Sequence, residues 1–275
     1  ADDILNEEAQ REFLELKKKL ASDVDSVTMP YYLAFDEYGN VSFSLRRHRL
    51  VRRERNFRWR GQVHEYLEVQ GKIVHSNVII IHQSTSSLSD RNLKIYENKL
   101  KRKEEFTPRD LYYYANELFD HLRYAEAIVI YEKFLSQKKG WLEDNVAACG
   151  KLADCYNAQG DKEGELRSIL RPFGYDSPRA EFCCRLGYHF LNRADYLSAI
   201  FWYRLATQIK QDEGQLGFFN RAYSTWLPHL QLCVCYSKIG AYKLAYLHNE
   251  MALQYRPRDA TILNNKEFLK KYLEQ

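Results

Sequence analysis

The sequence predicts two kinds of structure in one chain: an α/β or β-rich unit in the first third, followed by an all-α array of helical repeats. Two observations predict this. Before residue 83, short apolar and alternating runs are separated by turn residues. From residue 108 onward, apolar residues recur every three or four positions, in stretches that resemble one another. We therefore expect three segments: residues 1–83, a linker and connecting helix over 84–107, and a repeat domain over 108–275.

The composition is that of a globular protein. Of the 275 residues, 45% are hydrophobic and 14% aromatic. No apolar run approaches the roughly 18 residues needed to cross a bilayer, so we expect no transmembrane segment. The start, Ala1-Asp2-Asp3, lacks the basic and apolar regions of a signal peptide.

The six cysteines form no Cys-x-x-Cys pair. Their spacing fits neither a zinc site nor a disulfide framework. We interpret them as small buried residues in a reducing compartment, which predicts a cytoplasmic protein. A metal site built from Cys183, Cys184, Cys233 and Cys235 is the alternative.

In the first third, the pattern predicts a surface helix over residues 7–20 and then strands. Residues 27–35 and 41–45 read as two strands joined by a turn over 36–40. Later strands are expected at 48–51, 65–69, 72–74 and 77–82, with Gln70-Gly71 as the turn between the middle two. Asp90 is expected to cap a basic helix that runs to about Lys103.

The rest of the chain is self-similar. A small residue after an apolar one recurs at Ala115, Ala153, Gly187 and Cys233, at intervals of 38, 34 and 46 residues. Small residues allow two helices to approach closely, and an aromatic after each turn fills the gap between pairs. This pattern resembles the tetratricopeptide repeat. It implies a superhelix of about four repeats, capped by a helix within 258–275.

Two departures from the repeat pattern have structural consequences. Lys162 and Glu165 replace the aromatic and the alanine of the second copy, so its second helix is expected to be looser. The 46-residue interval implies an insertion near 208–222. A repeat stack offers a concave surface for a peptide or protein partner. The histidines at 121, 189, 229 and 248 are scattered and form no catalytic group.

One short window holds most of the excess positive charge. Residues 46–60 contain eight arginines, no lysine and one glutamate, a net of +7 in a chain whose total is +4. Arginine favours bidentate recognition of anions such as a diphosphate. A solvated basic strand pair and a nucleic-acid patch are the alternatives. Because the remaining chain is acidic, we predict no nucleic-acid partner.

Three shorter features suggest a site. In Trp59-Arg60-Gly61-Gln62-Val63-His64-Glu65, we expect a strand that points His64 and Glu65 to opposite faces. Gly61 would allow close approach of backbone or ligand. Asp2-Asp3 could bind Mg²⁺ or Mn²⁺ or cap the following helix.

The order of these features resembles the second half of the family 2 glycosyltransferases of the GT-A fold. The matching segments are Ala1-Asp2-Asp3, Arg49-Leu50-Val51-Arg52, Trp59-x-Gly61-x-Val63-His64-Glu65 and a strand ending in His82. The resemblance is greatest to bacterial members that carry C-terminal tetratricopeptide repeats. It implies a fold class: a fragment of a nucleotide-diphospho-sugar transferase followed by an all-α superhelix.

The resemblance also implies roles. Asp2 and His64 would bind Mn²⁺ or Mg²⁺, with Asp3 a weaker candidate. Glu65 would be the general base. The substrate-binding residues would be Arg49, Arg52, Trp59, Gly61 and His82. The reaction would be an inverting transfer from a nucleotide-sugar donor to a peptide, protein or glycan acceptor.

The family's donor-binding half would precede residue 1, so this chain alone is expected to be inactive. The alternative function is a non-catalytic scaffold that binds a protein partner through its repeats. Convergence of Asp2, His64 and Glu65 in one cleft would favour the enzyme.

Overall fold

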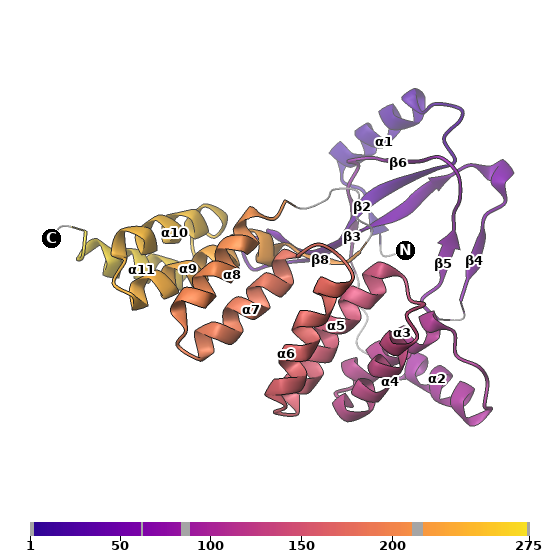
Figure 1. The fold of residues 1–275 in the computed structure, drawn as a ribbon. Helices are drawn as coiled ribbons and strands as arrows, with labels where there is room; N and C mark the ends of the chain where they lie inside the picture. The colour runs from indigo at the N-terminus through magenta and orange to yellow at the C-terminus, as the bar shows by residue number, and fades with distance from the viewer. Residues whose placement is uncertain (1–2, 62, 84–88, 211–216, 274–275) are drawn as a thin grey trace.

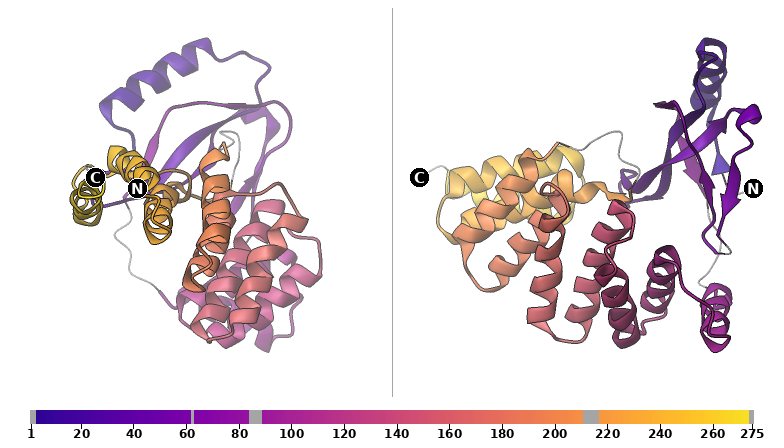
Figure 2. Two further views of the ribbon diagram at one scale, coloured as in Figure 1. Left: turned by 60° about the vertical axis from the view of Figure 1, so that its left-hand side comes forward. Right: turned by 45° about the vertical axis from the view of Figure 1, so that its right-hand side comes forward.

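A computed structural model describes residues 3–61, 63–83, 89–210 and 217–273 (Figure 1). A β-rich unit comes first and a row of antiparallel helices follows. Figure 2 shows these helices side by side, with the β-rich unit along one side of the stack. In the part of the chain that is described, no helix is both long and apolar enough to cross a membrane.

The β-rich unit, residues 3–83, is built on a mixed sheet with the strand order β1-β7-β2-β3-β8. Strands β2 and β3 form an antiparallel hairpin, and β6 and β7 run parallel to β2. The strands predicted at 41–45 and 48–51 form one continuous strand, β3. The strands are β1 (Asp3–Ile4), β2 (Ser26–Phe35), β3 (Val41–Val51), β4 (Arg58–Arg60), β5 (Tyr66–Glu68), β6 (Ile73–His75), β7 (Ile80–His82) and β8 (Phe219–Asn220).

Helix α1 (Glu7–Lys19) covers part of the sheet, as its apolar stripe predicts. Asn6 begins it, and its side chain accepts a hydrogen bond from the Ala9 amide at 2.8 Å. Ala9 is buried against a small core that includes Val27 and Met29 of β2, both fully buried. This core fixes the sheet that carries the predicted site residues.

Strands β4 and β5 form a separate two-stranded ribbon. Gln70-Gly71 lies between β5 and β6, as expected, and Gly71 has a φ of 97°, but these two strands do not pair with each other: β5 pairs with β4, and β6 pairs with β2. The strand expected through His64 and Glu65 is wrong. His64 has a left-handed backbone (φ 53°) and lies in the loop between β4 and β5. A turn, rather than strand alternation, therefore orients these two side chains.

The helices after residue 90 pair as the repeat pattern predicts. Thr107 and Asp110 form a capping box at the start of α3. The second helix of the second copy is nine residues long, where its counterparts in the other pairs have 13 or 14. The helices are α2 (Arg91–Lys101), α3 (Pro108–Asp120), α4 (Tyr124–Ser136), α5 (Leu142–Ala158), α6 (Lys162–Leu170), α7 (Ala180–Asn192), α8 (Tyr196–Gln208), α9 (Trp226–Lys238), α10 (Tyr242–Tyr255) and α11 (Ala260–Lys270).

The repeated small residues lie where paired helices touch. Ala115, Ala153 and Cys233 are at most 2% exposed, and Gly187 is buried. A Cβ added to Gly187 would lie 2.8 Å from the ring carbons of Tyr203, on the facing helix. Side-chain size at this position therefore sets how closely α7 and α8 pack.

The β-rich unit touches the repeats at both ends of the stack. Near the first pair, Glu117 of α3 bonds His64. Near the last pair, Arg256 forms ion pairs with Asp36 and Glu37 of the β2–β3 turn. Between them, β8, from the insertion expected near 208–222, adds to the edge of β3. The sheet thus bridges the repeat stack.

Candidate functional site

The structure brings three of the predicted site residues together at one end of the sheet. Asp3, Arg49 and His82 come from β1, β3 and β7 and lie around the side chain of Tyr31. The Tyr31 hydroxyl lies 2.6 Å from Asp3 Oδ1 and 2.6 Å from His82 Nδ1. Arg49 Nη1 lies 2.9 Å from Asp3 Oδ2, and its guanidinium stacks over the Tyr31 ring. We call these four residues the strand-end cluster.

The strand-end cluster keeps Asp3 ionised. Burial acts to raise the pKa of Asp3, but the hydrogen bond from Tyr31 and the charge of Arg49 outweigh it, so the pKa lies below its usual value. The pKa of Tyr31 is raised by burial and by its bond to Asp3. Arg49 keeps two buried donors, Nε and Nη2, without an acceptor in the described part of the chain. The cluster therefore has unused capacity for an anion.

The same cluster does not fit a divalent cation by itself. Among the described residues, no group of three or more His, Cys, Asp or Glu side chains could hold a metal ion. Asp3 and His82 are the potential ligands here, and Arg49 already neutralises Asp3. Asp2, the first predicted ligand, lies outside the described residues.

His64, the other predicted ligand, belongs to a different group. Its Nε2 lies 2.8 Å from Oε1 of Glu117, and its ring stacks on Tyr113 with centroids 4.3 Å apart. Burial acts to raise the pKa of Glu117, but hydrogen bonds from His64 and Asn92 lower it below the usual value. Arg109 donates to the His64 carbonyl at 2.8 Å. These contacts tie the ribbon loop to α3.

The neighbouring predicted residues are open to solvent. Trp59 is 69% exposed on the ribbon, so it is available for stacking and does not pack in the core. Glu65 is exposed. Gly61 has a φ of 98°, and a Cβ there would lie 3.3 Å from the Val63 carbonyl oxygen. The glycine is therefore required for the turn that carries His64 and Glu65.

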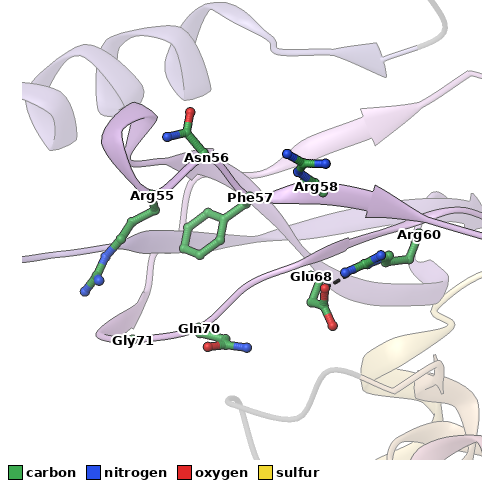
Figure 3. A pocket seen from close by; sticks show the side chains of 8 residues that line it. All are labelled: Arg55, Asn56, Phe57, Arg58, Arg60, Glu68, Gln70 and Gly71. Carbon is green, nitrogen blue, oxygen red and sulfur yellow. Dashed lines mark hydrogen bonds and ion pairs between the residues drawn. The ribbon is translucent and has the colours of Figure 1, made fainter.

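Much of the arginine window serves the fold. Asp25 is buried and holds Arg55 through two hydrogen bonds, of 2.7 and 2.9 Å, and Arg52 at 3.5 Å. The hydrogen bond from Arg55 is the main reason that the pKa of Asp25 lies far below its usual value. A shallow hollow of about 510 Å³ lies beside Phe57 and is drawn in Figure 3, where a dashed line joins Arg60 to Glu68. Arg58, in this hollow, has no carboxylate partner among the described residues.

A second, larger hollow is a groove whose lining residues the sequence did not predict. It has a volume of about 880 Å³ and lies between the β-rich unit and the inner helices of the repeats. Phe43 and His64 line it from one side, and Tyr113, Trp141 and Tyr223 from the other. Helical periodicity gives the inward face of each helix, but it does not show that the sheet closes the groove. That closure depends on contacts between distant segments.

A buried carboxyl group with a raised pKa follows Glu143, which lines this groove. Asp144 of α5 is 7% exposed, and burial raises its pKa to about 6. The charge of Arg109 opposes this rise. Asp144 has no hydrogen-bond partner in the described part of the chain, so it is a titratable group near neutrality.

Comparisons with known proteins bear on the repeats. No family model matches the chain, and no curated protein does. The apo form of RapI superposes with a TM-score of 0.52 at 14% identity, over 68% of this chain and 56% of RapI. The C-terminal part of a tetratricopeptide-repeat protein from Cytophaga hutchinsonii gives 0.50 at 16% identity, over 64% of this chain and 63% of that one. MamA gives a TM-score of 0.47 at 18% identity, over 58% of this chain and 84% of MamA.

The helical part of the chain has a tetratricopeptide-repeat fold. The helix pairs, their close contacts at small residues and the two superpositions at or above 0.50 agree on this. At these identities the likeness concerns the fold alone. It does not test the glycosyltransferase resemblance of residues 1–83, which stays a prediction.

Proposed function

We propose that this chain is a binding protein whose repeats hold a peptide or protein partner in the groove beneath the sheet. The observation that carries this proposal is the groove itself, about 880 Å³ in volume and walled by aromatic side chains from both units. Trp141 lies in it and is 49% exposed, so its ring has surface that a partner can cover. Exposed aromatic rings in a concave site are frequent binding hot spots.

The charges of the groove support specificity more than affinity. Arg185 pairs with Asp154 at 2.6 Å, and Arg179 pairs with Glu143 at 2.7 Å. Because these ions are already compensated, a partner gains most from apolar burial and from hydrogen bonds. The groove therefore fits an extended segment with aromatic or aliphatic anchors.

A peptide-display selection on the full chain tests this function. Selected peptides should bind at least tenfold more weakly to Trp141→Ala, as expected for a central aromatic. Leu197→Ala is the matched control, because Leu197 is 72% exposed on α8 and does not line the groove. Equal losses in both variants, or none in Trp141→Ala, would exclude the groove as the binding site.

A second candidate is the glycosyltransferase that the sequence resembles. The strand-end cluster supports it, because three residues to which the resemblance gives site roles, Asp3, Arg49 and His82, meet around Tyr31. The free donors of Arg49 suit a phosphate oxygen of a nucleotide-sugar donor. The exposed Glu65 carboxylate would take the proton from an acceptor hydroxyl or thiol.

In this proposal, Mn²⁺ or Mg²⁺ would stabilise the leaving diphosphate in the intact enzyme. The described residues alone do not fit the ion, so we derive no step through it. Trp59 would stack on the acceptor, and Arg52 would support the site through its bond to Asp25.

Transfer assays and calorimetry with nucleotide sugars test this candidate. Glu65→Gln should abolish transfer in the intact enzyme and leave donor affinity unchanged, since a base acts on the acceptor. Arg49→Gln should weaken donor binding. If Glu65→Gln retains full activity, the assigned base is wrong. Peptide binding in the groove without any transfer would favour the scaffold.

A further inference from the structure

Most of the outer edge of β3 has no strand partner in the described part of the chain. Strand β3 pairs with β2 along its length, but on its other side it pairs with β8 over Phe43 and Ser44 alone. From Leu45 to Val51, the outer edge has no strand partner among the described residues. Such an edge presents free backbone N–H and C=O groups that another strand can bond.

The chain itself shows that this edge accepts a strand. Asn220 lies opposite Phe43 and Phe219 opposite Ser44, in antiparallel register. These two residues come from the insertion between α8 and α9, more than 170 positions later in the sequence. Strand addition at β3 is therefore already part of the fold, and an added strand could continue beyond Ser44.

The charge of the edge selects the kind of partner. Residues 45–53 contain five arginines and no acidic residue. Arg47 is exposed, stacks on Tyr31 with its guanidinium carbon 5.1 Å from the ring centroid, and has no carboxylate partner in the described part of the chain. Opposite charges on adjacent strands attract, whereas a basic strand would be repelled.

We propose that the β3 edge binds an extended acidic segment of a partner protein by strand addition, with a carboxylate opposite Arg47. Backbone hydrogen bonds would supply affinity, and acidic side chains at alternate positions would supply specificity. The inference goes beyond the groove function. The two surfaces adjoin, because Phe43, which pairs with Asn220 just before the unpaired edge, also lines the groove.

Short synthetic peptides test this proposal on the full chain. The probe alternates glutamate with valine, and its matched control alternates lysine with valine. A third peptide is the glutamate probe with alternate amides N-methylated, which removes edge hydrogen bonds and keeps the charge. Fluorescence anisotropy should show binding of the glutamate probe alone, with a loss of at least about tenfold on N-methylation.

Charge reversal and hydrogen exchange locate the site. Arg47→Glu should weaken the glutamate probe about tenfold and create binding of the lysine control. Arg167→Glu, on the exposed face of α6, is the matched control and should change the binding of neither peptide. Amides within residues 45–51 should become protected from exchange when the probe binds.

Several results would overturn the inference. Equal binding of the N-methylated peptide, or of a short oligothymidine, would show general attraction to the arginines instead of strand addition. Undiminished binding by Arg47→Glu would exclude the assigned contact. Protection confined to α3 and α5 would place the probe in the groove, which would refute the edge site and leave the proposed function standing. No binding of the glutamate probe would also refute it.

Discussion

One prediction isolates the close helix contact that defines each repeat. Replacing Gly187 with alanine adds a single methyl group in the middle of α7. In the native geometry this methyl carbon would lie 2.8 Å from three ring carbons of Tyr203, closer than real Cβ contacts allow. Tyr203 is 1% exposed, so neighbouring side chains surround its ring. The two helices must therefore separate, or the ring must leave its preferred rotamer.

The size of the effect follows from two opposing terms. Overpacking a core by one methyl group costs about 1–3 kcal/mol. Alanine in place of a mid-helix glycine stabilises the helix by about 1 kcal/mol, because alanine has the higher helix propensity. We expect Gly187→Ala to destabilise the protein by about 1 kcal/mol.

Gly150 supplies the matched control within the same fold. It also lies inside a repeat helix, α5, but its added Cβ would meet the ends of Glu181 and Arg185 at 3.2 and 3.6 Å. These are tips of long side chains that can shift, so the helix-propensity gain should dominate. Gly150→Ala should therefore stabilise the protein by about 0.5–1 kcal/mol.

Urea and thermal unfolding, followed by circular dichroism, measure both variants. The two melting temperatures should differ by about 4 °C, with Gly187→Ala the lower. Because the clash involves the Tyr203 ring, a second substitution, Tyr203→Leu, should cost less in Gly187→Ala than in the native chain. If Gly187→Ala is as stable as Gly150→Ala, the close-contact explanation of the repeat glycine is wrong.

Three further predictions concern contacts between elements. Burial lowers the pKa of His248 to about 4, and the Nδ1 atoms of His248 and His229 lie 3.0 Å apart. Below pH 6.5 the unfolded chain therefore binds more protons than the folded chain. The free energy of unfolding should fall by about 1–2 kcal/mol as the pH drops from 6.5 to 4, and it should fall less in His248→Asn. Urea unfolding at each pH measures both changes. Arg109→Gln removes the bond to the His64 carbonyl, and amide exchange over 58–68 should become faster while α7–α10 stay unchanged. Arg256→Ala breaks ion pairs to Asp36 of the β2–β3 turn and to Asp259 before α11. It should destabilise the fold by about 2–4 kcal/mol, because these two largely buried carboxylates lose their partner; a melting temperature equal to that of the native chain would refute this.

Local patterns predicted the helices well, because helical periodicity and capping are properties of neighbouring residues. Asp90 precedes α2 as expected, but its side chain accepts no capping hydrogen bond from that helix. The ribbon was harder to predict. Gln70-Gly71 has the composition of a hairpin turn, yet Gly71 packs against the buried Asp25 and leads into a parallel pairing with β2. Turn composition alone does not choose the pairing partner.

For the predicted site residues, too, the sequence indicated some placements correctly and others not. Sequence motifs point to Asp3, Arg49 and His82, and the sheet brings all three to the side chain of Tyr31. His64 was expected in a strand, but the left-handed turn after Gly61 directs it to Glu117 of α3. The roles of Glu65, Trp59 and the metal ligands stay predictions.

Local sequence patterns indicate a β-rich unit joined to a stack of helix pairs, because each pair is encoded by apolar and small residues within about 40 positions. The way in which the two parts combine depends on contacts that form only in the folded chain. Strand β8 reaches β3, Arg256 reaches the β2–β3 turn, and the groove forms between them. These contacts join residues more than 170 positions apart, and their geometry depends on the curvature of the whole stack. No local sequence pattern specifies that curvature.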